Sequence, residues 1–424
     1  MGQLKVAYGE VDITPHFPVD LAGYGARVNP CIGILDPIFA TFMLYETNER
    51  KALLVGFDLL AIGKKIKEKI LSALGKIGFS PDEIFLFGTH THSAPSTGGV
   101  SYMGEEYEQW LEDVVDSLVY PLRKAISEAK ACELRAGGGE VNIALNRRTI
   151  EGWLPQKKEV GYVEKEFAFL SVDNIPFLNF TCHAVCLTEK NRFISADFPG
   201  RARIYLKSFL ETPLVLLANG AAGDQNPIER EIYGVEKTGR TLAEASYSAM
   251  EKMERVNGKI LRYAHQMVAF PLAQPPSIAE LEEFIALQRK GLEEAPLPEQ
   301  NIRRGYIRWA EDTIEKIKKG NYEKQVIGKV SLLRIGEIAI LFLPGEIFSE
   351  IGAKAREILR DKGFLPFIVG YYDELVGYIP TASAFEEGGY EVSDAYKWYG
   401  KPAPFLPTVE DILLESVKEL VEKI

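Results

Sequence analysis

The sequence has few cysteines, no long apolar run and no excess of positive charge. Its four cysteines, Cys31, Cys132, Cys182 and Cys186, are too few and too scattered in 424 residues for a disulfide framework, so we expect free thiols. No apolar run approaches the roughly 18 residues that a membrane span needs, which predicts no transmembrane segment. The 49 basic and 60 acidic residues give a net charge of −11, which argues against nucleic acid as a partner.

A secretory signal is also missing at the start of the sequence. The first residues, MGQLKVAYGEVDITP, lack a basic segment followed by an apolar one. We therefore expect a cytoplasmic protein. The hydrophobic content of 46% and the mixed charge predict a globular chain with a large core.

Apolar runs alternate with segments of helical periodicity along most of the chain. Two runs within residues 38–60, joined by TNER, predict a hairpin; residues 64–77 predict a helix, and EIFLFGTHT predicts the next strand. Further strands are expected in EFAFLSV, FLNFTCHAV, PLVLLANGAAGD, QVIGKVSLLRI and EIAILFL, and further helices from Pro199 and from Ile347. A charged stretch at about 276–322 predicts a helical insertion. The pattern predicts an α/β fold with a mixed β-sheet core flanked by helices, in one domain over residues 1–424.

The stretch FLFGTHTHSAP places two of the five histidines directly after a predicted strand. On a strand, side chains two residues apart share a face, so His90 and His92 are expected to point the same way. Ligands of open α/β sheets gather beyond the carboxyl ends of such strands. The alternative is a pair of ordinary, hydrogen-bonded histidines at a strand end.

A third histidine, His183, follows another apolar run, where it is either a structural residue or a metal ligand. Cys182 and Cys186 flank it, which leaves open a zinc site that includes thiolates. On a strand, however, Cys182 would face away from His183.

Two other segments have ordinary structural interpretations when each is taken alone. Glu346, after Pro344 and Gly345, is an acidic residue near a predicted helix N-terminus. The small residues of GAAGDQNP suit either a turn or an anion cradle at a helix start. No phosphate-binding loop is present, because GFDLLAIGKK has the wrong spacing.

Nine short motifs occur in the order in which the neutral ceramidase family has them: DITPHFPVDLAGYGAR, GTHTHSAP, NRR, FTCHAV, SADFPG, NGAAGDQNP, LPGE, GYIPT and GGYE. The sequence resembles the catalytic domain of that family over about residues 8–400. The resemblance implies the fold of that domain and a zinc amidohydrolase, which in the family cleaves the amide of ceramide. Because the chain ends at residue 424, we expect the family's C-terminal β-sandwich domain to be absent.

The resemblance also implies roles for individual residues. The zinc ligands would be His90, His183, Glu346 and Tyr378. Zinc bound in this way lowers the pKa of a water molecule to about 7.

The catalytic residues follow in the same way. His92 would accept a proton, and Arg147 and Tyr390 would stabilise the oxyanion. Asp224 is the next candidate for the general base. Asn226 replaces a serine of the family motif GDVSPN; it cannot be a nucleophile, although it can orient a water or a substrate carbonyl.

The sequence therefore predicts a zinc-dependent hydrolase of an amide bond in an N-acyl compound, either a small molecule or a lipid. Two alternatives stay open. One is an esterase or carbohydrate deacylase with the same metal centre, and the other is a metal-bearing binding protein without catalysis.

Overall fold

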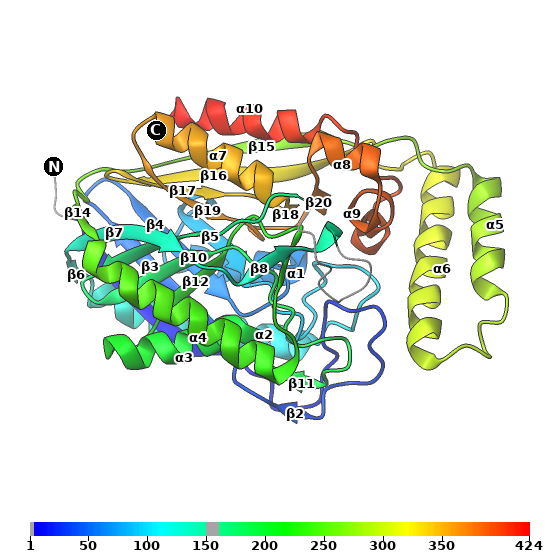
Figure 1. Cartoon of the computed structure of the whole chain (residues 1–424), viewed down its shortest axis with the longest axis horizontal. Helices are drawn as coiled ribbons and strands as arrows, with labels where there is room; N and C mark the ends of the chain where they lie inside the picture. The colour runs from blue at the N-terminus through cyan, green and yellow to red at the C-terminus, as the bar shows by residue number, and fades with distance from the viewer. Residues whose placement is uncertain (1–3, 150–160) are drawn as a thin grey trace.

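Three β-sheets form the centre of the computed structural model, which describes residues 4–149 and 161–424 (Figure 1). The first sheet has the strand order β5-β4-β3-β1-β6. Its strands are β1 (Lys5–Asp12), β3 (Phe39–Glu46), β4 (Lys51–Phe57), β5 (Ile84–Gly88) and β6 (Lys130–Ala131). β3 and β4 are the predicted hairpin, and β4 runs parallel to β5. Helix α1 (Lys64–Gly75) connects β4 to β5, as the periodicity predicts.

The second sheet has the order β12-β10-β9-β7-β14. Its strands are β7 (Leu134–Glu140), β9 (Glu166–Val172), β10 (Ile175–Phe180), β12 (Leu216–Asn219) and β14 (Glu254–Val256). β9 and β10 are antiparallel, and β10 and β12 are parallel, with α3 (Asp197–Leu210) between them in sequence.

The third sheet has the order β15-β16-β17-β19. Its strands are β15 (Leu261–Pro271), β16 (Gln325–Ile335), β17 (Ile338–Phe342) and β19 (Leu365–Val369). β17 and β19 are parallel and are connected through α7 (Ser349–Asp361). That helix begins two residues after the predicted start, because residues 346–347 pair in a short strand instead.

Three pairs of short strands complete the described sheets. They are β2 (Gly33–Ile34) with β11 (Phe193–Ile194), β8 (Ala144–Asn146) with β13 (Gln225–Pro227), and β18 (Glu346–Ile347) with β20 (Tyr378–Ile379).

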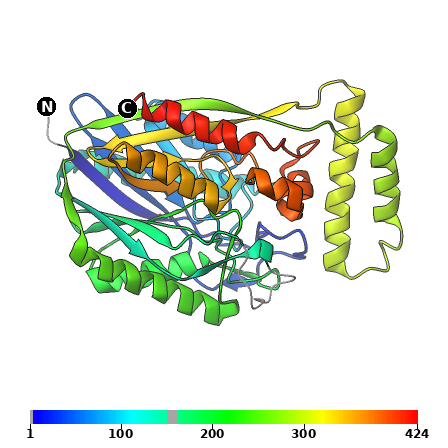
Figure 2. The same ribbon diagram turned by 45° about the horizontal axis from the view of Figure 1, so that its top comes forward.

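The apolar core lies where the three sheets face one another. Phe85, Phe177 and Phe342, one from each sheet, are fully buried members of this central cluster. Helices cover the outer faces (Figures 1 and 2): α1 and α2 (Glu108–Ser127) the first sheet, α3 and α4 (Glu231–Ala249) the second, and α7 and α10 (Val409–Val421) the third. Each outer interface has its own apolar cluster. The predicted α/β fold with a mixed core flanked by helices is confirmed.

The predicted insertion is a pair of helices, α5 (Ile278–Arg289) and α6 (Leu297–Lys318), which projects from one end of the molecule (Figures 1 and 2). A capping box formed by Ser277 and Glu280 begins α5. The two helices share a small apolar cluster around Trp309, whose indole N–H donates to the Lys401 carbonyl at 2.7 Å. Two short helices, α8 (Ala382–Glu387) and α9 (Tyr390–Ser393), follow β20 in the sequence.

None of the helices within the described residues is long and apolar enough to cross a bilayer.

Candidate metal centre and active site

Candidate metal ligands follow the carboxyl ends of strands in all three sheets. His90 comes two residues after β5, His183 three residues after β10, and Glu346 four residues after β17. Each of these strands belongs to a parallel pair, and the pairs present their carboxyl ends to the same end of the molecule. The fold thus brings together side chains that are far apart in the sequence, at the place where α/β sheets bind ligands.

The two histidines of the HTH motif converge, but the reason predicted from strand alternation is wrong. Strand β5 ends at Gly88, and His90 has a φ of 65°, a left-handed conformation that non-glycine residues rarely adopt. This turn of the backbone brings His90 Nε2 to within 3.2 Å of His92 Nε2. Strand β10 likewise ends before Cys182 and His183, so alternation orients neither of them.

Backbone carbonyls determine the tautomers of the three histidines. His90 Nδ1 lies 2.7 Å from the Leu60 carbonyl oxygen, and His183 Nδ1 lies 2.6 Å from that of Ala222. His92 Nδ1 lies 3.1 Å from the carbonyl oxygen of Gly23. Because a carbonyl oxygen only accepts, each Nδ1 carries the proton and each Nε2 presents a lone pair.

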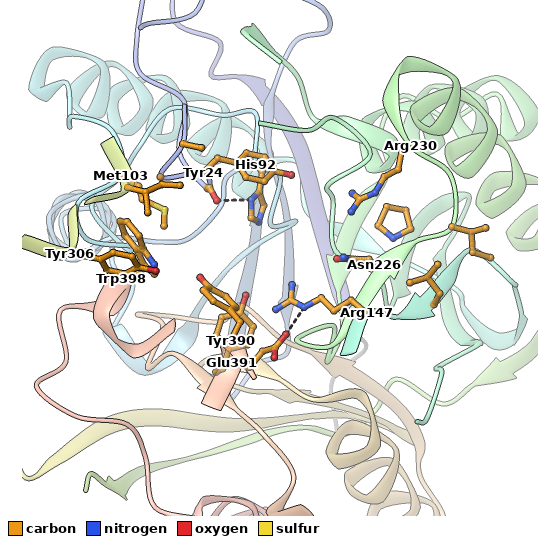
Figure 3. A pocket seen from close by; sticks show the side chains of 18 residues that line it. Tyr24, His92, Met103, Arg147, Asn226, Arg230, Tyr306, Tyr390, Glu391 and Trp398 are labelled. Atoms are coloured by element: carbon orange, nitrogen blue, oxygen red, sulfur yellow. Dashed lines mark hydrogen bonds and ion pairs between the residues drawn. The ribbon is translucent and has the colours of Figure 1, made fainter. Parts of the chain in front are cut away.

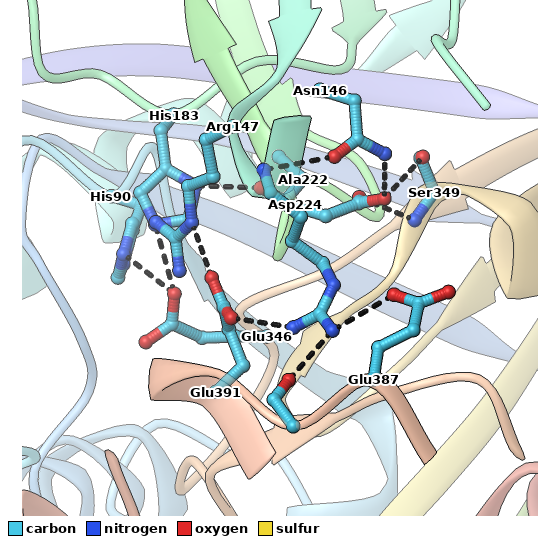
Figure 4. Close-up of polar contacts among 12 residues, drawn as sticks. His90, Asn146, Arg147, His183, Ala222, Asp224, Glu346, Ser349, Glu387 and Glu391 are labelled. Carbon is cyan, nitrogen blue, oxygen red and sulfur yellow. Dashed lines mark hydrogen bonds and ion pairs between the residues drawn. The ribbon is translucent and has the colours of Figure 1, made fainter. Parts of the chain in front are cut away.

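The lone pairs of His90 and His183 face a carboxylate oxygen at a shorter distance than any donor (Figure 4). Glu346 Oε2 lies 2.9 Å from His183 Nε2 and 3.2 Å from His90 Nε2. Two ligand atoms that are each about 2.0–2.1 Å from a tetrahedral ion are roughly 3.3 Å apart. The separations and the chemistry of the donors therefore fit a metal ion, and the nitrogens of His90, His92 and His183 form a group that could hold one.

Burial keeps the imidazoles of His92 and His183 neutral. It lowers the pKa of His183 to about 4 and lowers the pKa of His92 well below its usual value, an effect to which the neighbouring histidines add. Burial acts to raise the pKa of the Glu346 carboxyl, but His90 and His183 hold it well below its usual range. The centre is therefore prepared for a cation over a wide range of pH.

Three buried tyrosines surround the ligands. Tyr378, the predicted fourth ligand, pairs with Glu346 in the β18–β20 ladder, which places it beside the centre. The Tyr399 hydroxyl donates to Glu346 Oε1. Tyr371 stacks on the His90 ring with 4.0 Å between the ring centroids. Tyr371 and Tyr399 were not predicted as site residues, although the stretch from Gly370 to Gly400 is rich in tyrosine.

The two cysteines that flank His183 are directed elsewhere. Cys182 Sγ lies 3.6 Å from the His183 carbonyl oxygen, and Cys186 Sγ lies 3.8 Å from the Thr238 hydroxyl. Both belong to the apolar cluster beneath α3 and α4, and burial raises the pKa of both thiols. They are free thiols, as predicted, and the alternative thiolate site receives no support from their surroundings.

A pocket of about 460 Å³ opens in front of this centre (Figure 3). Five of the predicted site residues line it: His92, Arg147, Asn226, Tyr378 and Tyr390. The remaining wall is mostly apolar and aromatic, and includes Tyr24, Met103, Ile302, Tyr306 and Trp398. A pocket of this kind, with a few convergent polar groups, is typical of a small-molecule site.

Arg147 is held at the border between the pocket and the metal centre. Its Nε donates to Glu391 Oε1 at 2.8 Å, and its Nη1 lies 3.5 Å from His183 Nε2 (Figure 4). Its Nη2 is buried and has no hydrogen-bond acceptor in the described part of the chain. Glu391, which the sequence analysis also missed, thus orients a guanidinium that has a donor left for a ligand.

The other predicted catalytic residues differ in position. Tyr390 is 44% exposed and lines the open side of the pocket. Asp224 is buried outside the pocket lining, and its carboxylate accepts from the Ser349 N–H at 2.8 Å and from Asn146 Nδ2 at 2.9 Å. These contacts favour a positioning role for Asp224, and its predicted role as a base finds no support in them.

Comparisons with known proteins agree with this architecture. Neutral ceramidases B and A of Dictyostelium discoideum are 25% and 24% identical to the chain over 222 residues. Each alignment spans 47% of this chain but only 31% of the relative. The crystal structure of neutral ceramidase from Pseudomonas aeruginosa covers 99% of this chain and 74% of its own, with a TM-score of 0.76 and 18% identity. A structure described as ceramidase complexed with C2 superposes with a TM-score of 0.74, also at 18% identity, covering 99% of this chain and 75% of its own.

The profile of the family described as neutral/alkaline non-lysosomal ceramidase, N-terminal, matches residues 4–215, which is half of the chain. This stretch contains His90, His92, Arg147 and His183. The chain belongs to the neutral/alkaline non-lysosomal ceramidase family.

Proposed function

We propose that the protein is a zinc-dependent hydrolase of an amide bond in an N-acyl compound. The observation that carries the proposal is the convergence of imidazole lone pairs on the Glu346 carboxylate behind a pocket lined by Arg147. His90, His183 and Glu346 would hold the ion, with Tyr378 as the fourth ligand. When bound, zinc would act as a Lewis acid and would make a water molecule nucleophilic near neutral pH.

The residues of this chain would supply the rest of the chemistry. The Arg147 Nη2 group would donate to the acyl carbonyl oxygen as negative charge develops on it, and the Tyr390 hydroxyl would assist from the open side. His92 is neutral, with its Nε2 lone pair available, and would take a proton and return it to the leaving nitrogen.

N-acyl lipids are the first substrates to test, and ceramide is one of them. The mostly apolar wall of the pocket suits an acyl or alkyl chain, because burial of apolar surface contributes roughly 25 cal/mol per Å². The proteins matched above carry the name ceramidase, and the proposal extends that chemistry to this chain.

The test is a substrate panel with zinc supplied. It contains N-acyl lipids, N-acyl amino acids, simple esters and acetylated sugars, and His90→Ala is the metal-site control. Hydrolysis of an N-acyl compound by the wild type but not by the control supports the proposal. Activity on the esters or acetylated sugars alone would assign the centre to an esterase or deacylase instead. A zinc-loaded wild type that hydrolyses nothing on the panel would overturn the enzyme proposal.

A further inference from the structure

The wall of the active-site pocket contains a buried carboxamide with an unsatisfied oxygen. Asn226 is 2% exposed and lines the pocket near Arg147 (Figure 3). Its Oδ1 has no hydrogen-bond donor within reach among residues 4–149 and 161–424. Leaving such a group unpaired costs about 1–3 kcal/mol, so a buried example calls for a physical reason.

The two preceding residues show that the loop is well ordered. The Asp224 carboxylate accepts from Ser349 and Asn146, as described above. Gln225 Nε2 donates to the Ser349 hydroxyl at 2.9 Å and to the Tyr162 carbonyl at 3.1 Å. Of three consecutive polar side chains, two are therefore satisfied within the protein, while the one that faces the pocket has an unpaired acceptor.

Asn226 lies in the β8–β13 ladder, and Arg147 directly follows β8. Asn226 pairs with Leu145 in the β8–β13 register, and the Arg147 N–H donates to the Asp224 carbonyl at 2.8 Å. Within the described residues, the pocket wall thus offers an acceptor without a donor, Asn226 Oδ1, and a donor without an acceptor, Arg147 Nη2.

A secondary amide has the complementary pair of groups, a carbonyl oxygen that accepts and an N–H that donates. An ester has the carbonyl oxygen but carries a second oxygen in place of the N–H. With an ester bound, Asn226 Oδ1 would stay unpaired and would face an oxygen lone pair.

We propose that Asn226 Oδ1 accepts a hydrogen bond from the N–H of the scissile amide, and that this contact makes the pocket selective for secondary amides over isosteric esters. The inference rests on the proposed function. A site built to bind a substrate N–H rejects an analogue that lacks it, because the polar group of the protein is then left buried and unpaired. Asn226 is in this view a specificity residue, a role distinct from orientation of the substrate carbonyl.

The experiment compares one amide with the ester of the same acyl group and the same chain, in the wild type and three variants. Asn226→Leu removes the acceptor at similar volume, whereas Asn226→Asp keeps an acceptor oxygen. Ile228→Val, at another lining position, is the matched control. Zinc content and melting temperature establish that each variant is folded and loaded.

We expect Asn226→Leu to lower kcat/KM for the amide by about 10- to 100-fold relative to the ester. Asn226→Asp and Ile228→Val should keep the amide-to-ester ratio within a few-fold of the wild type. An equal fall for amide and ester in Asn226→Leu would overturn the inference, and so would a loss of the ratio in Asn226→Asp.

The outcomes distinguish a failure of the proposed function from a failure of the role of Asn226. If the wild type hydrolyses neither the amide nor the ester, the proposed function is wrong and the inference falls with it. If the wild type hydrolyses both, and the ratio is the same in all variants, the hydrolase proposal stands and only the role of Asn226 is wrong. Should Asn226→Leu fail to fold, Asn226→Ala replaces it, because it also removes the acceptor oxygen and is expected to lower the amide-to-ester ratio in the same way; an unchanged ratio in Asn226→Ala would overturn the inference.

Discussion

The two histidines of the HTH motif are adjacent in space but have different contacts and different predicted roles. His90 faces Glu346, whereas His92 lines the pocket. We expect His90→Ala and His183→Ala to lose zinc and activity together, because the loss of either imidazole leaves the ligand shell incomplete. His92→Ala should keep most of its zinc and lose about 10²- to 10⁴-fold in rate, as is typical for an acid–base group. Elemental analysis and steady-state kinetics measure both effects.

Cys182→Ser is the control for these variants, since it changes a neighbour of His183 that lies outside the centre, and its zinc content should equal that of the wild type. The alternative is that His92 is itself a metal ligand. His92 Nε2 lies only 3.2 Å from His90 Nε2. If His92→Ala loses zinc as completely as His90→Ala while it remains folded, His92 is a ligand and another residue must accept the proton.

Tyr399 positions Glu346 from behind the metal centre. Its hydroxyl donates to Oε1, which leaves Oε2 directed at the two imidazoles. Partners that orient a metal ligand typically contribute 10- to 100-fold to metal affinity. We therefore expect Tyr399→Phe to bind zinc about 10-fold more weakly, measured by competition with a chelator of known affinity. Tyr396→Phe, at a half-buried ring packed on Trp309, is the matched control. Equal affinities in the two variants would contradict the role of Tyr399.

At the scale of elements, α6 forms one wall of the pocket by packing on Trp398. The indole lies between two glycines: a Cβ added at Gly305 would lie 2.6 Å from the ring, and one added at Gly25 would lie 2.9 Å from it. Both backbones therefore approach the ring closely, and a side chain at either position would meet it. This close approach brings Ile302 and Tyr306 of α6 to the pocket.

Gly305→Ala tests whether this docking shapes the pocket. The added methyl group should displace either Trp398 or α6, so we expect a raised KM for a substrate that the wild type accepts, with the zinc content unchanged. Gly75→Ala, at the last position of α1 with open space around it, is the control, and should keep the KM and stabilise the fold by about 0.5–1 kcal/mol. The same KM in both variants would show that the position of α6 does not affect substrate binding.

Two helices, α2 and α4, were not predicted from the sequence. Each contains residues of low intrinsic helix propensity. Helix α4 contains Gly234 and Gly239, and α2 contains Pro121. In the fold Gly239 has a clear purpose, since a Cβ there would lie 2.8 Å from the Phe198 carbonyl oxygen of α3. Close packing between helices thus outweighs intrinsic helix propensity. No local sequence pattern reveals which helices will pack together.

At the scale of the whole molecule, neutral buried histidines couple the stability of the metal-free protein to pH. In the folded chain the pKa of His183 is about 4, whereas an unfolded chain has a histidine pKa near 6.5. Between these values the unfolded state binds more protons, so the stabilisation present above pH 6.5 is lost as the pH falls toward 4. We expect the free energy of unfolding to fall by up to about 3 kcal/mol from this residue. Urea titrations of chelator-treated protein at pH 7, 5.5 and 4.5 measure it.

His183→Gln supplies the comparison, because it removes the titrating group but can still donate to the Ala222 carbonyl. Its unfolding free energy should depend less steeply on pH over the same interval. A wild type whose stability is constant from pH 7 to 4.5, or one that is stabilised by acid, would contradict the lowered pKa of His183.

By itself, the sequence determined which segments become the main strands and which residues are candidates for the chemistry. The β3–β4 hairpin, the strand before the HTH motif and the helical insertion follow from periodicity, which is a local property. The nine motifs that resemble those of the neutral ceramidase family likewise single out His90, His183 and Glu346 as candidates, and imidazole and carboxylate groups are known zinc ligands.

Only the tertiary structure decided how these candidates act. The lone pairs of His90 and His183 are directed at Glu346 because the carbonyls of Leu60 and Ala222, on other segments, take the Nδ1 protons. The fold likewise engages Asp224 with Ser349 and Asn146 while it leaves the neighbouring Asn226 Oδ1 unpaired at the pocket. Hydrogen bonding and burial depend on groups far away in the chain, so no pattern of adjacent residues can specify them.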